Sequence, residues 1–212
     1  MPPPTEPYLA QIVRWPSRGR HILAHDDATS VAVYQAYRPN IGRFAATHGY
    51  FGGAFSLDRT SWIKPNVLWM MFRNGWGTKE RQEVTLAVRL ARAAFDEILA
   101  TAISSSLASV IYASEQEWAS TLRQAAVVYQ WDPDHDPSGR RIERRAIQLG
   151  LRGTALFRIC KIIAFFLFCA LIMASVVFRI VNSWSGSHPL QAATLPGGAG
   201  SCGVWATTAR TG

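Results

Sequence analysis

The feature that most constrains the fold is a change in the spacing of apolar residues within the first ~150 positions. Val84, Leu86, Val88 and Leu90 alternate with other residues, which is the period of a strand with one buried face. From Phe95 onward the apolar residues recur at helical spacing instead. Segments of both periods follow one another irregularly along the chain. We therefore expect one mixed α+β domain rather than a regular doubly wound fold.

Further strands follow from the same pattern. Residues 29–37 and 127–131 are rich in β-branched and aromatic residues, and 145–149 alternates as a partner for the second of these strands. We expect the dipeptide Asp132-Pro133 to close the strand over 127–131 as a turn. Within 62–72, Pro65 separates a strand-like entry from a second buried piece.

Helices are expected at two capped positions. Pro39 can open a helix through His48. Ser114 and Glu117 have the form of a capping box, which predicts a helix through about Gln124. The expected core consists of Val33, Leu68, Trp69, Leu86, Val88, Phe95, Val128, Ile147 and Leu149.

The formal net charge of +8 is unevenly distributed. Up to Glu143 the chain holds 15 basic and 14 acidic residues, and after it seven basic and no acidic ones. Five of these seven precede an apolar segment: Arg144, Arg145, Arg152, Arg158 and Lys161. Such a cluster suits an anionic membrane surface, or it is a basic strand and loop of a soluble domain. A nucleic acid fits less well as a partner, because the domain itself is nearly neutral.

Residues Ile162–Phe178 carry no charge. As a helix they would reach roughly 26 Å, and an extension to Val181 would match a bilayer core of ~30 Å, with Arg179 snorkelling to the headgroups. We expect an extended basic arm over 1–29, the α+β domain over 30–158, a transmembrane helix within 159–181 and a disordered tail over 182–212. The positive-inside rule then places the domain in the cytosol on a single-pass membrane protein.

Polar and amphipathic residues interrupt the apolar segments of the domain. Burying such groups is costly unless they are paired, so a domain that sets several beside core strands could use them to line a pocket. The candidates are Tyr34, Gln35, Arg59, Trp62, Lys64, Arg73, Gln130, Asp132, Arg145 and Gln148. Cationic, amide and aromatic side chains together suit an anionic, planar ligand such as a nucleotide. The alternative is a set of ion pairs and amphipathic side chains that serve only the fold.

Other motifs predict no further chemistry. Asp132, Asp134, Asp136 and Glu143 have the spacing of calcium ligands in a loop, but Pro137 stands where such a loop needs glycine. We therefore expect a turn with solvated carboxylates and no metal. There is no phosphate-binding P-loop and no serine nucleophile motif, and the sequence predicts no particular cofactor.

Four blocks carry a resemblance to a known family: Val33–Tyr37 (VYQAY), Arg59–Lys79 (RTSWIKPNVLWMMFRNGWGTK), Gln130–Pro133 (QWDP) and Ala146–Gly153 (AIQLGLRG). The chain resembles domain of unknown function 4291 over about residues 30–153. The resemblance implies one folded domain and no established activity. Members of the family continue past Leu-Arg-Gly as folded sequence, whereas here an apolar segment follows. This end is either an acquired anchor or a gene-model artefact, and in the second case we expect a cytoplasmic protein.

Three functions are open from the sequence. The first is a binding module, tethered to a membrane by the apolar segment. The second is a nucleotide- or NAD-using transferase. Val33–Tyr37, Ile41–His48 and Lys64–Met71 are similar, in their order only, to the strand, helix and apolar strand of DNA-targeting ADP-ribosyltransferases, and Glu83 would be the acid. The third is a nucleic-acid-binding domain. The oligomeric state is not predicted.

Overall fold

The computed structural model describes residues 5–107, 112–166, 170–171, 194–196 and 204–206. The elements in chain order are β1 (Thr5–Pro7), α1 (Tyr8–Ile12), β2 (Gly19–Leu23), β3 (Ser30–Tyr37), α2 (Pro39–His48), β4 (Ser61–Ile63), α3 (Val67–Arg73), η1 (Gly75–Gly77), β5 (Val84–Ala91), α4 (Arg92–Thr101), β6 (Ile103–Ser104), α5 (Glu115–Gln124), β7 (Val127–His135), β8 (Arg141–Leu151), α6 (Gly153–Phe166), β9 (Ala170–Leu171), β10 (Thr194–Pro196) and β11 (Val204–Ala206).

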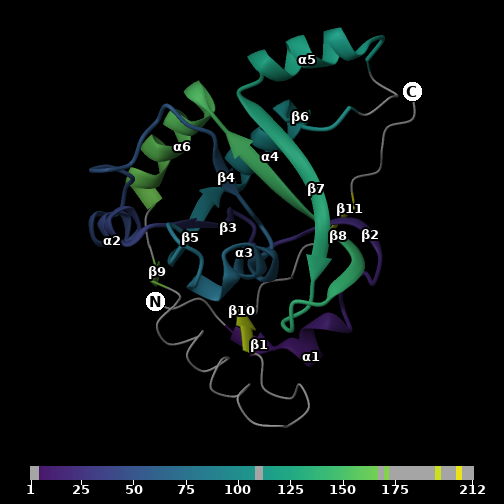
Figure 1. Cartoon of the computed structure of the whole chain (residues 1–212). Helices are drawn as coiled ribbons and strands as arrows, with labels where there is room; N and C mark the ends of the chain where they lie inside the picture. The colour runs from purple at the N-terminus through teal and green to yellow at the C-terminus, as the bar shows by residue number, and fades with distance from the viewer. Residues whose placement is uncertain (1–4, 108–111, 167–169, 172–193, 197–203, 207–212) are drawn as a thin grey trace.

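The strands form two main sheets (Figure 1). The larger has the order β11-β2-β8-β7-β6. Strand β2 pairs with β8 at Arg144 and Arg145, and β4 pairs with the last three residues of β8, Leu149–Leu151. The centre of this sheet is the long antiparallel hairpin of β7 and β8, in which Gln130 lies opposite Gln148. The smaller sheet has the order β3-β5-β9, and β1 pairs with β10 separately. Helices α2, α4 and α6 pack against β5 of the smaller sheet.

The two sheets are joined by a pair of backbone hydrogen bonds. Tyr34 N donates to Lys64 O at 2.7 Å, and Lys64 N donates to Tyr34 O at 3.0 Å. Helix α3 begins directly after this bridge and contacts both β3 and β7. The residue that follows β4 is thereby held between the sheets.

One apolar core fills the space between the sheets and the helices. It combines Val33 and Leu86 of the smaller sheet with Ile147 and Leu149 of the larger one. All nine residues expected in the core are buried, each no more than 5 % exposed, which confirms that prediction. The expected mixed α+β class and single domain are confirmed as well.

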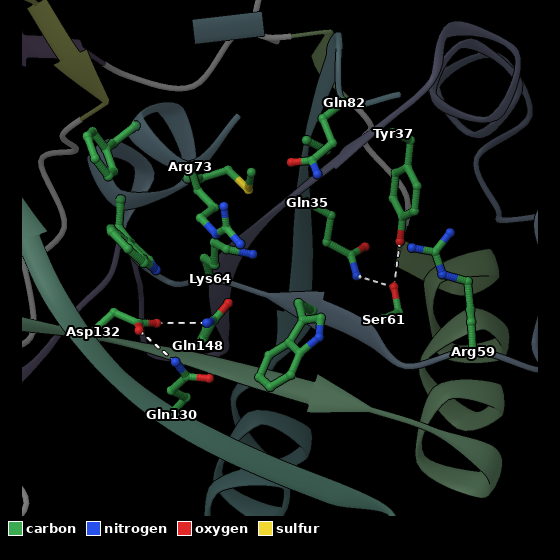
Figure 2. A pocket seen from close by; sticks show the side chains of 15 residues that line it. Gln35, Tyr37, Arg59, Ser61, Lys64, Arg73, Gln82, Gln130, Asp132 and Gln148 are labelled. Atoms are coloured by element: carbon green, nitrogen blue, oxygen red, sulfur yellow. Dashed lines mark hydrogen bonds between the residues drawn. The ribbon is translucent and has the colours of Figure 1, made fainter. Parts of the chain in front are cut away.

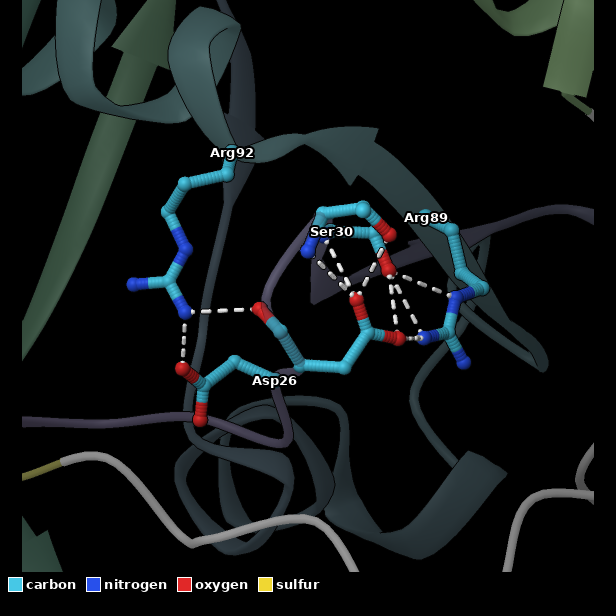
Figure 3. Close-up of polar contacts among 6 residues, drawn as sticks. Asp26, Ser30, Arg89 and Arg92 are labelled. Atoms are coloured by element: carbon cyan, nitrogen blue, oxygen red, sulfur yellow. Dashed lines mark hydrogen bonds and ion pairs between the residues drawn. The ribbon is translucent and has the colours of Figure 1, made fainter.

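Carboxylate–arginine pairs fix the start of β3 to the end of β5 (Figure 3). Arg92 pairs with Asp26, and Arg89 pairs with Asp27. The Asp27 carboxylate also accepts hydrogen bonds from the backbone N of Ser30 at 2.8 Å and from its hydroxyl at 3.0 Å. We call these four charged residues the paired-charge cluster.

The apolar stretch after Pro65 forms a helix, whereas the likeness to ADP-ribosyltransferases needs a strand over Lys64–Met71. Asn66 Oδ1 accepts hydrogen bonds from the backbone N of Leu68 at 2.9 Å and of Trp69 at 3.2 Å, so the side chain caps α3. This removes the strand on which the likeness to ADP-ribosyltransferases depends. The other capped helix is confirmed, because Ser114 Oγ accepts a bond from Glu117 N at 3.1 Å.

The N-terminal segment is part of the fold, which corrects the expected extended arm over 1–29. It contains α1 and strand β2, and Ile22 of β2 is 1 % exposed in the core. Arg144 Nη1 donates to Pro16 O at 2.9 Å, and its guanidinium lies 5.2 Å from the ring centre of Trp15. Contacts that join residues 128 positions apart could not be read from local patterns.

Helix α6 starts within the domain and runs into the expected membrane segment. Leu156 and Ile159 of α6 belong to the core. Most of the predicted span Ile162–Phe178 and of the tail over 182–212 lies outside the described residues. None of the helices in the described part of the chain combines the length and apolar character needed to cross a bilayer.

Candidate functional site

A cavity of about 490 Å³ opens where the two sheets and α3 meet (Figure 2). Its walls come from β3, β4, α3, β7 and β8, so residues far apart in the sequence converge there. The lining residues are Gln35, Ala36, Tyr37, Arg59, Ser61, Trp62, Lys64, Trp69, Met70, Phe72, Arg73, Gln82, Gln130, Asp132 and Gln148.

The wall formed by β7 and β8 holds a carboxylate in a fixed orientation. Gln130 Nε2 donates to Asp132 Oδ1 at 2.8 Å, and Gln148 Nε2 donates to Oδ2 at 2.7 Å (Figure 2). Gln130 and Asp132 are two residues apart on one strand and share a face, and Gln148 lies opposite Gln130. The two amides thus orient the carboxylate and leave their own carbonyl oxygens as acceptors.

Asp132 can take this place because it lies within a strand, which corrects the expected turn at Asp132-Pro133. Pro133 is paired opposite Arg145 in the ladder, and β7 continues to His135. The register shifts between Pro133 and His135, an irregularity of the kind that accommodates proline in a strand.

Lys64 is the most deeply buried cation of the cavity, at 5 % exposure. Burial lowers the pKa of its amine from 10.5 to about 8, and the charges of Arg73 and Lys79 lower it further, while Asp132 acts in the opposite direction. Within the described residues Nζ makes no hydrogen bond or ion pair at contact distance. At pH 7 the amine is mostly protonated but close to its pKa.

Helix α3 presents a cation and aromatic rings to the same cavity. Trp69 and Arg73 are four residues apart and therefore lie on one face of the helix. Trp69 is 5 % exposed, and its Nε1–H has no acceptor among the described residues. The ring of Phe72 stacks on that of His135 with centroids 3.5 Å apart, and burial lowers the pKa of His135. The wall thus offers flat apolar surfaces beside a guanidinium.

The opposite wall is built by β3 and the start of β4. Gln35 Nε2 donates to Ser61 Oγ at 3.2 Å, and the hydroxyls of Tyr37 and Ser61 lie 2.7 Å apart (Figure 2). Burial raises the pKa of Tyr37, so the phenol stays neutral. The guanidinium of Arg59 lies 5.9 Å from the ring centre of Tyr37 at the exposed edge of this wall.

A buried ionic network behind the cavity positions α3. Arg144 Nε and Asn66 Nδ2 both donate to Asp134 Oδ2, at 2.7 and 3.1 Å. Asp134 and Arg144 are 0 and 2 % exposed. Because Asn66 is the cap of α3, this network connects the orientation of Trp69 and Arg73 to the hairpin of β7 and β8.

Eight of the ten candidate residues line the cavity: Gln35, Arg59, Trp62, Lys64, Arg73, Gln130, Asp132 and Gln148. Tyr34 and Arg145 are not among the lining residues. Tyr34 is adjacent to Gln35 on β3 and points to the opposite face, where it packs with Met70. Arg145 is three residues from Gln148 on β8, so the two also face opposite sides.

The sequence analysis does not predict several of the residues that line the cavity. Tyr37 could have been found, since it shares a strand face with Gln35. Trp69 was assigned to the core, and only its unpartnered Nε1–H distinguishes it from a core residue. Ser61 and Gln82 carried no local signal.

The other candidate residues have roles in the fold. Asp136 Oδ1 accepts from the backbone N of Ser138 at 2.9 Å and of Arg140 at 3.0 Å, so this carboxylate closes the hairpin turn. Glu83 Oε1 accepts from Arg81 N at 2.9 Å and is not a lining residue of the cavity. In the described part of the chain no group of three or more metal-ligating side chains is close enough to hold an ion.

A family model described as "Domain of unknown function (DUF4291)" matches residues 21–164. The match contains every residue that lines the cavity. Comparison with curated proteins gave no match. Comparison with solved structures gave none either.

Proposed function

The chain belongs to the DUF4291 family, whose function is unknown, and from its cavity we propose that the protein binds a small, planar organic anion of the nucleotide class. The observation that carries the proposal is the charge of the lining residues. Arg59, Lys64 and Arg73 are three cations, and Asp132 is the one carboxylate among the residues that line the cavity.

The excess of positive charge is not compensated by the protein within this cavity. Both oxygens of Asp132 already accept hydrogen bonds from glutamine amides. Lys64 is held at 5 % exposure although the charged form of a buried amine is disfavoured. A ligand with a phosphate or carboxylate group would supply the missing counter-charge, and Arg73 could bind it through two parallel hydrogen bonds.

The uncharged lining residues support a planar ligand. Trp62, Trp69 and Phe72 offer aromatic surfaces for stacking. The carbonyl oxygens of Gln130 and Gln148 are acceptors, since their Nε2 groups are both directed to Asp132. A volume of about 490 Å³ is within the range of small-molecule sites.

Calorimetric titration of the full chain with AMP, ATP and NAD tests the proposal. Arg73→Gln should weaken the tightest of these complexes by about 10- to 100-fold, the equivalent of one charge-assisted hydrogen-bonding group. Arg43→Gln is the matched control, because Arg43 is an exposed arginine of α2 that does not line the cavity. Absence of binding to all three compounds, or equal losses in the two variants, would contradict the proposal.

A further inference from the structure

We propose that the amine of Lys64 forms a covalent imine with the ligand. The ligand would then be a small organic anion that carries an aldehyde or ketone group. This inference deepens the proposed function and rests on it. It starts from the position of one amine relative to the charges that surround it.

The backbone of Lys64 is fixed more firmly than that of an ordinary surface lysine. Its N and O both bond to Tyr34 across the junction of the two sheets, at 3.0 and 2.7 Å. Pro65 follows, and the capped helix α3 begins two residues later. The side chain therefore starts from a rigid point and lines the cavity while being 5 % exposed. A nucleophile on a rigid element is held near one attack geometry.

The surroundings of Lys64 favour the neutral amine, which is the nucleophilic form. Burial disfavours the ammonium most, the charges of Arg73 and Lys79 add to this effect, and Asp132 acts in the opposite direction. With a pKa of about 8, about one amine in ten is neutral at pH 7, against about one in 3,000 for a lysine with a pKa of 10.5. Desolvation and a neighbouring cation are the two means by which proteins activate lysine for attack on carbonyl groups.

The step balances without a redox partner. The neutral amine attacks the carbonyl carbon, and a C–N bond forms as the C–O π electrons move to oxygen. The two protons of the amine nitrogen are transferred to that oxygen, which leaves as water, and the C=N bond remains. The Asp132 carboxylate, oriented by Gln130 and Gln148, can relay these protons.

Arg73 would bind the anionic group of the ligand. The amine of Lys64 would then not have to stay protonated to neutralise that group. An arginine at position 64 would bind an anion equally well, but it stays protonated and cannot attack a carbonyl. The chain contains only three lysines among 22 basic residues, Lys64, Lys79 and Lys161. The cavity thus contains the one type of cation that can form an imine.

Reductive trapping on the full chain tests the inference. The probes are pyridoxal 5′-phosphate, a planar anionic aldehyde, and pyruvate, an anionic ketone, each with cyanoborohydride at pH 7. Mass spectrometry of proteolytic peptides locates the label. We expect Lys64 to be labelled at least about tenfold faster than the exposed Lys79, and AMP to suppress the labelling. Equal labelling of the two lysines, or labelling of Lys64 that AMP does not suppress, would overturn the inference.

Variants separate this inference from the proposed function. Lys64→Arg should abolish trapping at position 64, and Lys79→Arg, at an exposed position outside the cavity, should leave trapping and the affinity for AMP unchanged. Arg73→Gln should lower both. If the unaltered chain binds AMP but neither probe is trapped on Lys64, imine formation is wrong and anion binding stands. If none of AMP, ATP and NAD binds, the proposed function itself fails.

Discussion

Next to β3, Arg92 and Arg89 pair with Asp26 and Asp27, whereas the cavity that Lys64 and Arg73 line has one carboxylate, and two glutamines already bond to it. The paired-charge cluster lies beside the first residues of β3, the cavity is lined by its last residues, and both regions contain carboxylates and basic side chains. In the paired-charge cluster each cation has its own carboxylate partner. In the cavity positive charge exceeds negative charge, and the most buried cation, Lys64, has no ion pair at contact distance among the described residues.

The difference separates charges that serve the fold from charges that serve binding. A paired, hydrogen-bonded charge can contribute to stability, while a buried charge without a partner lowers it. A cavity that retains such charges is less stable than it could be, as is typical of functional sites. The comparison therefore predicts opposite signs for mutations in the two regions.

Removing both carboxylates of the paired-charge cluster should have the largest effect. The double variant Asp26→Ala/Asp27→Ala removes the carboxylates that pair with Arg92 and Arg89 and the hydrogen bonds from Thr29 and Ser30 to Asp27. We expect the free energy of unfolding to fall by about 3–5 kcal/mol, because Asp26 is buried and Arg92 is mostly so. Urea unfolding followed by circular dichroism measures the change.

Asp58→Ala is the control for this variant, since Asp58 is an exposed carboxylate with no ion pair among the described residues. Its replacement should change the free energy of unfolding by less than about 0.5 kcal/mol. A double variant no less stable than Asp58→Ala would show that the paired-charge cluster does not hold β3 to β5.

Replacing Lys64 should have the opposite sign. Burial lowers the pKa of Lys64 from 10.5 to about 8. Keeping the protonated amine buried at pH 7 therefore lowers the free energy of unfolding by at most about 3 kcal/mol. Lys64→Met should therefore raise the free energy of unfolding by about 1–3 kcal/mol at pH 7. Lys79→Met, at an exposed position, should not. A less stable Lys64→Met variant would mean that the amine contributes to the fold.

The same effect should appear as a pH dependence of the unaltered chain. Between pH 8 and 10.5 the folded chain has lost the Lys64 proton while the unfolded chain still binds one. The contribution of Lys64 therefore makes the protein more stable as pH rises through this interval. The gap between the unaltered chain and Lys64→Met should narrow from pH 7 to about pH 10.

The smallest effect is expected at Arg59. It is exposed at the edge of the cavity and contacts only the ring of Tyr37, at 5.9 Å, among the interactions of the described residues. Arg59→Gln should change the free energy of unfolding by about 0.5 kcal/mol or less. Thermal unfolding is a sufficient measurement. A loss of stability comparable to that of the double variant Asp26→Ala/Asp27→Ala would mean that Arg59 stabilises the fold, as the paired-charge cluster does.

Much of the fold followed from periodicity, because alternation and capping are local. Strand β5 and helix α5 were predicted with bounds close to those observed, and every predicted core residue is buried. The stretch after Pro65 was harder, since a short apolar run has no period that distinguishes a buried strand from a buried helix. Asn66 was the local signal that decides it, as a residue that caps helices.

The residue types of the candidate site were predictable from the sequence. Which side chains of each strand face the cavity was not. Tyr34 and Gln35 are neighbours on one strand, so at most one of them could face the cavity directly. Arg144, rather than Arg145, carries the buried pair with Asp134, and its partners at Pro16 and Trp15 are more than a hundred positions away. Such contacts depend on how the sheets come together, which no local pattern contains.

The bridge between Tyr34 and Lys64 limits how the molecule can admit a ligand. A hinge at this point would have to break two backbone hydrogen bonds, so the cavity cannot widen beside Lys64 without partial unfolding. Entry and release must then occur by rotamer changes at the rim, where Arg59, Phe72 and Arg73 are exposed. A ligand too wide for the space beside Lys64 is excluded by these backbone hydrogen bonds rather than by charge, and the size limit would survive any substitution of the rim residues.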